Sequence, residues 1–170
     1  MSYRLPIIVF FFALISLPSH AERTTLYSIN TGSFLFHLLP FDTDSNQYFD
    51  NNYFSIERKF SEESEYSLFV GTFLNSQANR CLLLGARKDW YQVNNKLMIK
   101  GVYSYAGEFF FDAFENCGDG GFYKTSKEKT GVGFAPYIYH SAQYNFTDHF
   151  ALEAGFILPL IFVMSAQWSF

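Results

Sequence analysis

Three polar residues, His37, Asn75 and Ser76, have side chains that together can move a proton and activate a hydroxyl. Histidine is the natural proton acceptor near neutral pH. A serine hydroxyl acts as a nucleophile or hydrogen-bond donor once a base polarises it, and an asparagine amide can orient such a pair. Asn and Ser are also ordinary turn residues, so residue type alone favours a strand-end histidine and a simple turn. The positions of these three residues in the fold must decide between a reactive set and a purely structural role.

A second pair, His140 and Ser141, is similar to the His and Ser of outer-membrane lipid A deacylases. Adjacent residues on a strand point to opposite faces of the sheet. On a strand, His140 would therefore face away from Ser141, which argues against a shared site.

The segment from Ile161 to Phe170 alternates with the two-residue period of a β-strand. With Trp168 near its end and Phe170 as its terminal aromatic, it resembles the closing strand of a bacterial outer-membrane β-barrel. In that class the barrel assembly machinery reads the C-terminal aromatic. One face is apolar and the other mostly polar: Phe162, Met164, Ala166, Trp168 and Phe170 against Val163, Ser165, Gln167 and Ser169.

The composition fits a protein with an apolar outside and a polar inside. Aromatic residues make up 21% of the chain, yet the mean hydropathy is −0.00, because apolar and polar residues are interleaved. This interleaving is typical of membrane barrels. The formal charge of −4 leaves no basic stripe to meet phosphates and argues against a nucleic-acid partner.

The first residues have the form of a secretory signal. Arg4 precedes an apolar run from Leu5 to Leu17, and small residues permit cleavage after Ala21. A retained transmembrane helix needs about 20 apolar residues, which is longer than this run. We therefore expect a signal peptide over residues 1–21 and one barrel domain over residues 22–170.

The sequence predicts an all-β fold, an eight-stranded antiparallel transmembrane β-barrel. Reading Phe150 to Met164 as a membrane helix instead is disfavoured, because the run is short and Pro159 interrupts it. An even strand number is usual, and lipid cannot satisfy an open sheet edge. The expected strands are Thr25–His37, Asn52–Phe60, Tyr66–Leu74, Cys81–Gln92, Leu97–Phe111, Gly131–Gln143, Phe150–Leu158 and Ile161–Phe170.

An even number of strands returns both termini to one side, which is the periplasm for this class. Short turns are then periplasmic: Ser61–Glu65, Val93–Asn95 and Thr147–His149. Longer loops are then external: Leu38–Asp50, Asn75–Arg80 and Asp112–Thr130. His37, Asn75 and Ser76 would all lie at the external rim, where they would face lipid A and misplaced phospholipid.

The two cysteines are expected to lie close together. Cys81 begins the fourth strand at its external end, and Cys117 lies in the external loop after the neighbouring fifth strand. An exported chain permits a disulfide between them. Without a nearby histidine cluster, they do not predict a zinc site.

Several charged residues are expected on inward faces, where an isolated charge must be paired to be tolerated. A structural network is favoured over a second active site. Its candidates are Glu57, Arg87, Lys100, Glu108 and Glu153.

The segment Phe73-Leu74-Asn75-Ser76, followed by Gly85, resembles the Phe-x-Asp-Ser segment and downstream Gly of PagP-like lipid A palmitoyltransferases. Phe36-His37 is similar to the catalytic His of that family. Pro136 and Pro159 resemble the prolines that open its barrel laterally to lipid, because proline lacks the backbone donor. Asn75 stands where the family has Asp. The resemblance also implies an interior space for an acyl chain, for which Gly85, Gly131, Gly133 and Ala135 would leave room.

The resemblance implies an outer-membrane acyltransferase that moves a fatty acyl chain from phospholipid to lipid A. His37 would be the base, and Asn75 and Ser76 its polarising or orienting partners. No metal or cofactor is implied. The alternative is a non-catalytic barrel that stabilises the membrane or binds a partner through its external loops.

Overall fold

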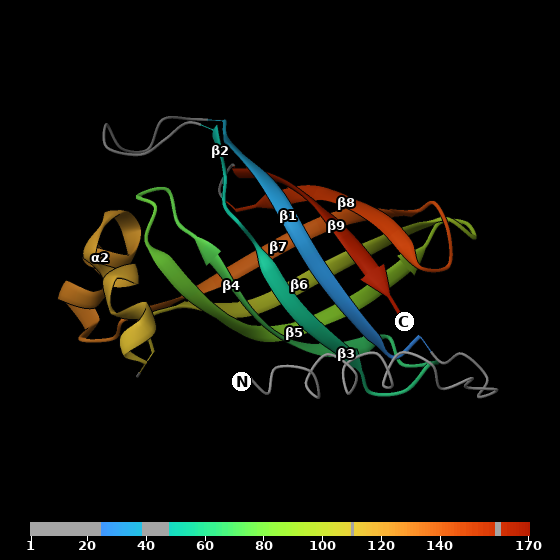
Figure 1. Ribbon diagram of the computed structural model, residues 1–170, viewed down its shortest axis with the longest axis horizontal. Coiled ribbons are helices and arrows are strands. Elements are labelled where there is room, and N and C mark those ends of the chain that lie inside the picture. Colours follow the sequence, from blue (N-terminus) through green and yellow to red (C-terminus); the bar gives the residue numbers. More distant parts are fainter. Residues whose placement is uncertain (1–24, 39–47, 110, 159–160) are drawn as a thin grey trace, which may run out of the picture.

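The computed structural model describes residues 25–38, 48–109, 111–158 and 161–170. The predicted signal peptide, residues 1–21, lies outside this part of the chain. Eight strands form one closed antiparallel barrel, which confirms the predicted fold (Figure 1). They are β1 (Tyr27–His37), β3 (Phe54–Lys59), β4 (Tyr66–Leu74), β5 (Arg80–Gln92), β6 (Leu97–Gly107), β7 (Phe134–Asn145), β8 (Phe150–Ile157) and β9 (Ile161–Ser169). A short β2 (Tyr48–Asp50) pairs with β1 beyond the reach of β3.

The barrel closes between its first and last strands. The β1–β9 ladder runs from the Ser28–Ser169 pair to the His37–Ile161 pair. It extends to the final residue, because the Phe170 amide donates to the Tyr27 carbonyl at 2.9 Å. Closure leaves neither strand with an exposed edge along this seam.

Strand β1 is bent at Gly32. The β1–β9 register shifts between Thr31 and Ser33, and Gly32 has a φ of 49°. A glycine adopts this left-handed conformation without steric cost, and a bulge of this kind adds one residue to a strand. As a result the inward positions change parity, from Ser28 and Asn30 before the bulge to Ser33 and His37 after it, and all four residues are buried.

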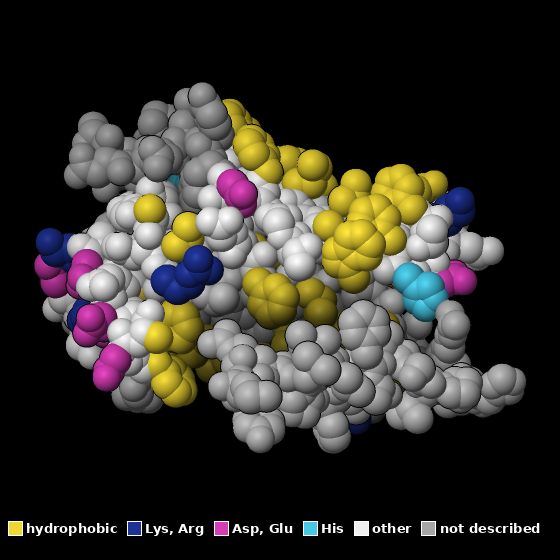
Figure 2. Space-filling view, viewed as in Figure 1, with side chains coloured by type: hydrophobic (Ala, Val, Ile, Leu, Met, Phe, Trp, Pro, Cys, Tyr) yellow, Lys and Arg dark blue, Asp and Glu magenta, His cyan; other side chains and the backbone are white. Residues whose placement is uncertain are grey.

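The two faces of the wall differ in the manner predicted. Interior positions carry buried polar side chains such as Asn30, Glu57 and Gln167. Exterior positions carry exposed apolar ones, among them Phe54, Leu68, Val70, Tyr105, Phe156, Met164 and Trp168. Figure 2 shows hydrophobic side chains along the wall, with charged side chains mostly toward the end that bears the helices. The polarity is therefore the reverse of that in a water-soluble barrel.

The structure corrects the prediction for the segment between the fifth and sixth strands. β6 ends at Gly107 rather than Phe111, because Phe109 has a φ of 51° and leaves the extended conformation. The expected loop Asp112–Thr130 contains a 3₁₀-helix η1 (Asp112–Asp119) and a helix α2 (Gly121–Thr130). Gly131 ends α2 with a φ of 70°, and β7 begins only at Phe134. Among the described residues, no helix is long and apolar enough to cross a membrane.

Residues 112–130, the cap, lie at one end of the barrel, which we call the helical end (Figure 1). The opposite end carries three short turns and is called the turn end. The cap is tied to the wall by the predicted disulfide between Cys81 and Cys117, whose Cα atoms are 5.0 Å apart. A second tie joins the Lys127 ammonium to the Glu108 carboxylate at 2.8 Å.

Candidate functional site

His37 lies at the helical end, where the seam of the barrel stops. It is the last residue of β1, is only 8% exposed and faces the interior. It shares one row of the sheet with Ile161 of β9, Ile157 of β8 and Tyr139 of β7. Each adjacent pair in this row is a cross-strand pair, so the row connects β1 to β7 without a break.

That same row is where the β7–β8 ladder begins. Residues 134–138 of β7 pair with β6, and the β7–β8 ladder begins at Tyr139. We call residues 134–138 the β7 extension. Pro136 lies in its middle, opposite Tyr105 of β6. Pro159 lies outside the described residues.

Asn75 is buried, and its amide group organises the loop that follows β4. Its Oδ1 accepts hydrogen bonds from the backbone amides of Gln77 and Asn79, at 3.0 and 2.9 Å. Its Nδ2 donates to the Cys117 carbonyl at 3.2 Å, which fastens the loop to the cap. Both ends of the amide are therefore engaged in backbone contacts. An asparagine makes these contacts as a neutral donor and acceptor, which an aspartate in its place could not do.

The strand registers separate His37 from Asn75 along the wall. The Asn51 amide donates to the Ser33 carbonyl, and the Leu74 amide donates to the Asn51 carbonyl. Leu74 is thus level with Ser33, so His37 lies three residues beyond Asn75 along the strand direction, which is about 10 Å at about 3.3 Å per residue. The predicted trio therefore divides: His37 lies in the row that ends the β7 extension, whereas Asn75 and Ser76 belong to the loop under the cap.

The charged residues of the interior form the predicted network in part. Arg87 lies 2.5 Å from Glu153 and 3.4 Å from Glu57. Ser141 donates to Glu153 and Ser67 donates to Glu57, each at 2.5 Å. The two remaining candidates lie elsewhere: Lys100 pairs with Asp89 at 3.3 Å, and Glu108 pairs with Lys127 of the cap. Paired in this way, these charges hold the wall together.

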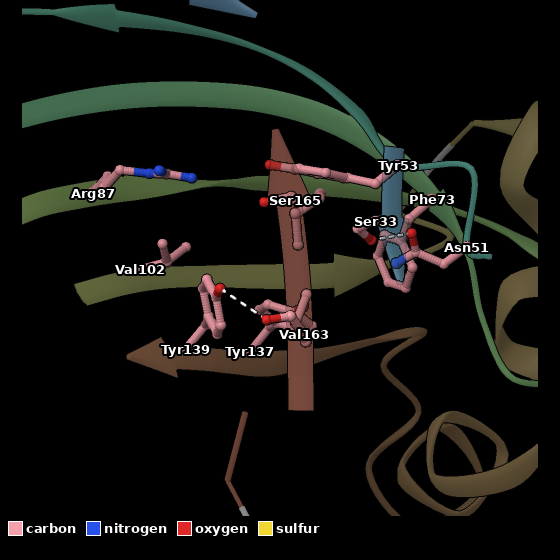
Figure 3. A pocket seen from close by; sticks show the side chains of 11 residues that line it. Ser33, Asn51, Tyr53, Phe73, Arg87, Val102, Tyr137, Tyr139, Val163 and Ser165 are labelled. Carbon is pink, nitrogen blue, oxygen red and sulfur yellow. Dashed lines mark hydrogen bonds between the residues drawn. The ribbon is translucent and has the colours of Figure 1, made fainter. Parts of the chain in front are cut away.

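Side chains fill the part of the interior between Arg87 and the helical end. It holds a cavity of about 30 Å³ lined by Tyr53, Phe73, Tyr137, Tyr139 and Val163, among others (Figure 3). Ligand pockets usually measure about 300–1,000 Å³, so this cavity is about tenfold too small for a long acyl chain. In the same view the Tyr139 hydroxyl donates to the Val163 carbonyl at 3.5 Å, which ties β7 to β9 across the interior.

The small residues expected to leave interior space for an acyl chain are packed closely against their neighbours. A Cβ on Gly85 would clash with Ser104, and one on Gly133 would clash with the Glu108 carboxylate. Gly131 ends helix α2, and Ala135 is buried at 2% exposure. These residues therefore allow close packing at their own positions, which the sequence cannot show without the register.

A larger opening lies at the turn end, a polar vestibule of about 830 Å³ whose lining includes Glu57, Lys59 and Lys100. It is mixed in charge and open to solvent. In the described part of the chain, no group of three His, Cys, Asp or Glu side chains is arranged to hold a metal ion.

Comparisons with known proteins support the fold alone. No protein-family model matches the chain, and no curated protein matches it. Among solved structures, the chain is similar to a designed transmembrane β-barrel from work titled "De novo design of transmembrane beta-barrels". The TM-score is 0.52 at 12% identity, over 85% of this chain and 95% of the designed one. A barrel is shared, and at this identity nothing about activity follows from it.

Proposed function

We propose that the protein is an integral barrel of the bacterial outer membrane, with its helical end facing outward. The outward apolar side chains and the buried polar interior support this placement, because only a closed barrel satisfies all backbone groups of strands in lipid. The two ends also differ as in that class, with short turns at one end and the long capped connection at the other. The terminal Phe170 would be read by the barrel assembly machinery.

We further propose that the protein is an acyltransferase that moves a fatty acyl chain from a phospholipid to lipid A. One observation carries this proposal: His37 ends the row of residues at which the β7–β8 ladder begins. A lipid in the outer leaflet would approach the wall at the end of this ladder, next to the interior face that carries the imidazole. Pro136 lies just beyond this row in the β7 extension, and it has no amide hydrogen to donate to a neighbouring strand.

In the proposed reaction His37 acts as a general base. Its neutral imidazole takes the proton from a lipid A hydroxyl, and the oxygen attacks the ester carbonyl of the phospholipid. The ester C–O bond breaks, and the departing lysophospholipid oxygen takes the proton back from the imidazolium. No metal or cofactor is needed for this balance. Asn75 and Ser76 support the rim and the cap, and are positioning residues in this scheme.

The packed interior restricts where the acyl chain lies. A cavity of about 30 Å³ holds no long chain. The chain therefore stays in the lipid outside the β7 extension, and only the ester group reaches the rim.

The second candidate is a non-catalytic barrel that stabilises the membrane or presents its cap to a partner. The filled interior favours it, because ring and aliphatic side chains occupy the space that a chain-measuring enzyme would need. In this case His37 would be a buried rim histidine without a chemical role.

Mass spectrometry of lipid A separates the two candidates. Cells carrying the wild type, His37→Ala, His149→Ala or an empty vector would be compared. His149 is an exposed histidine at the turn end and serves as the matched control. The enzyme predicts one added acyl chain in the wild type and in His149→Ala, and its loss in His37→Ala. Lipid A spectra identical to those of the empty vector in every strain would exclude acyl transfer and support the non-catalytic barrel.

A further inference from the structure

A compact polar cluster lies on the outer wall, on the side opposite the interior networks. His140 and Tyr103 both face outward, and the Tyr103 hydroxyl lies 3.5 Å from His140 Nε2. The Trp90 ring stacks on Tyr103 with a centroid distance of 6.5 Å, and the His140 ring meets both rings edge-on. A histidine side chain on a lipid-facing surface is energetically unfavourable, so we expect it to have a hydrogen-bonding partner there.

Gly101 is what allows this cluster to form. A Cβ on Gly101 would lie 2.5 Å from Trp90 Nε1 and 3.0 Å from the Tyr103 hydroxyl. The Trp90 indole nitrogen and the Tyr103 hydroxyl therefore both lie over the backbone of Gly101, which has no side chain. Any side chain at this position would push the indole and the phenol away.

The indole N–H of Trp90 has no protein acceptor among the described residues. The other tryptophan, Trp168, also faces outward, but its N–H donates to the Thr31 hydroxyl at 3.3 Å. An unsatisfied donor in a hydrocarbon environment costs several kcal/mol, so an acceptor from outside the protein is expected at Trp90.

The sheet register adds a positive charge to the same row. Lys88, Gly101 and His140 are consecutive cross-strand partners on β5, β6 and β7. The Lys88 ammonium lies 5.0 Å from the centre of the Tyr66 ring, which places it on the outer surface. Glu65, at the neighbouring turn, is the acidic residue closest in sequence to Tyr66. The Lys88 ammonium leans toward Tyr66 of β4, and Glu65 interacts with its charge. The donors of Trp90, Tyr103 and His140 therefore lie together on the wall, with Lys88 in the same row on their β4 side.

The row lies in the half of the wall nearer the turn end. Gly101 is four residues from the start of β6 at Leu97. At about 3.3 Å per residue and a tilt of about 45°, this is about 10 Å along the barrel axis, within an apolar band about 25 Å tall. A long lysine side chain reaches from such a depth toward the headgroups.

We propose that Trp90, Tyr103, His140 and Lys88 form a binding site for the phosphodiester group of a phospholipid in the periplasmic leaflet. A phosphate supplies the acceptor oxygens that the indole, hydroxyl and imidazole lack, and its charge complements the lysine. The site rests on the membrane placement proposed above. It is independent of acyl transfer, because His37 lies on the interior face and at the opposite end.

The test is NMR of the two indole N–H groups in the ¹⁵N-labelled barrel in detergent micelles. Trp90→Phe and Trp168→Phe assign the two resonances. We expect phosphatidylglycerol to shift the Trp90 resonance and leave Trp168 unchanged, while diacylglycerol and inorganic phosphate shift neither. His140→Phe should weaken the phosphatidylglycerol response about tenfold, as expected for the loss of a hydrogen bond to a charged group.

Three results would overturn the proposal. Equal shifts of both tryptophans would indicate a general aromatic belt. An equal response to diacylglycerol would show that the phosphate is not recognised. A response to inorganic phosphate alone would assign the site to a free anion. Loss of lipid A acylation would bear on His37 and leave this result untouched, so the two proposals fail separately.

Discussion

The Arg87 guanidinium lies 2.5 Å from the Glu153 carboxylate, although the two residues are 66 positions apart in the chain. β6 and β7 stand between their strands in the sheet, so this contact crosses the interior. Both side chains are almost fully buried, and Glu57 approaches Arg87 from a third strand. One cation therefore joins three strands of the wall through two carboxylates.

Removal of this cation should destabilise the barrel strongly. Arg87→Ala leaves two carboxylates buried without a counter-charge, which costs about 3–5 kcal/mol of unfolding free energy. Urea unfolding of the barrel in lipid vesicles measures the change. Arg80→Ala is the control, because Arg80 is less buried and only reaches the Asn52 carbonyl at 3.4 Å. If Arg87→Ala unfolds at the same urea concentration as Arg80→Ala, the interior network does not stabilise the barrel.

Loss of the disulfide should make the cap more accessible to protease and leave the strands of the barrel intact. Cys81 and Cys117 are joined across 36 residues, and a disulfide of this kind stabilises by about 2–4 kcal/mol. In a variant with both cysteines changed to serine, we expect trypsin to cut at Lys124, Lys127 and Lys129 at least about tenfold faster. Circular dichroism should still report the intact barrel. Unchanged cleavage would mean that Asn75 and Glu108 hold the cap without the disulfide.

The tie between Lys127 and Glu108 should respond to pH. The hydrogen bond with the Glu108 carboxylate raises the pKa of Lys127 above its ordinary value of 10.5. A raised pKa means that the contact stabilises the folded cap fully below pH 10.5 and that this stabilisation is lost as pH rises through the higher value. An NMR titration of the Lys127 side-chain carbons gives the midpoint. Glu108→Gln should lower this midpoint, and an identical midpoint in both proteins would contradict the contact.

The strands were predictable because a barrel wall repeats every two residues, and a slip of one residue would bury the wrong face. Val163, Ser165 and Gln167 face the interior as the terminal pattern predicts. The bulge at Gly32 has a local cause as well, since glycine adopts a φ of 49° without steric cost.

The structure of the cap could not be predicted from a two-residue repeat. Its glycines and mixed charges are typical of a loop, and its short helices depend on contacts from distant residues. The Asn75–Cys117 hydrogen bond and the Lys127–Glu108 pair are examples. The division of the predicted site had the same origin: the number and order of the strands placed His37 and Asn75 at one rim, but only the register shows how far apart they lie.

The seam between β1 and β9 has a consequence for folding. Ser28 of β1 finds its partner only at Ser169 of β9, although six strands of the wall lie between them in the sequence. β1 therefore keeps one row of backbone groups without a ladder until β9 is in place. A variant without β9 would be an open sheet with two exposed edges, and such edges promote aggregation.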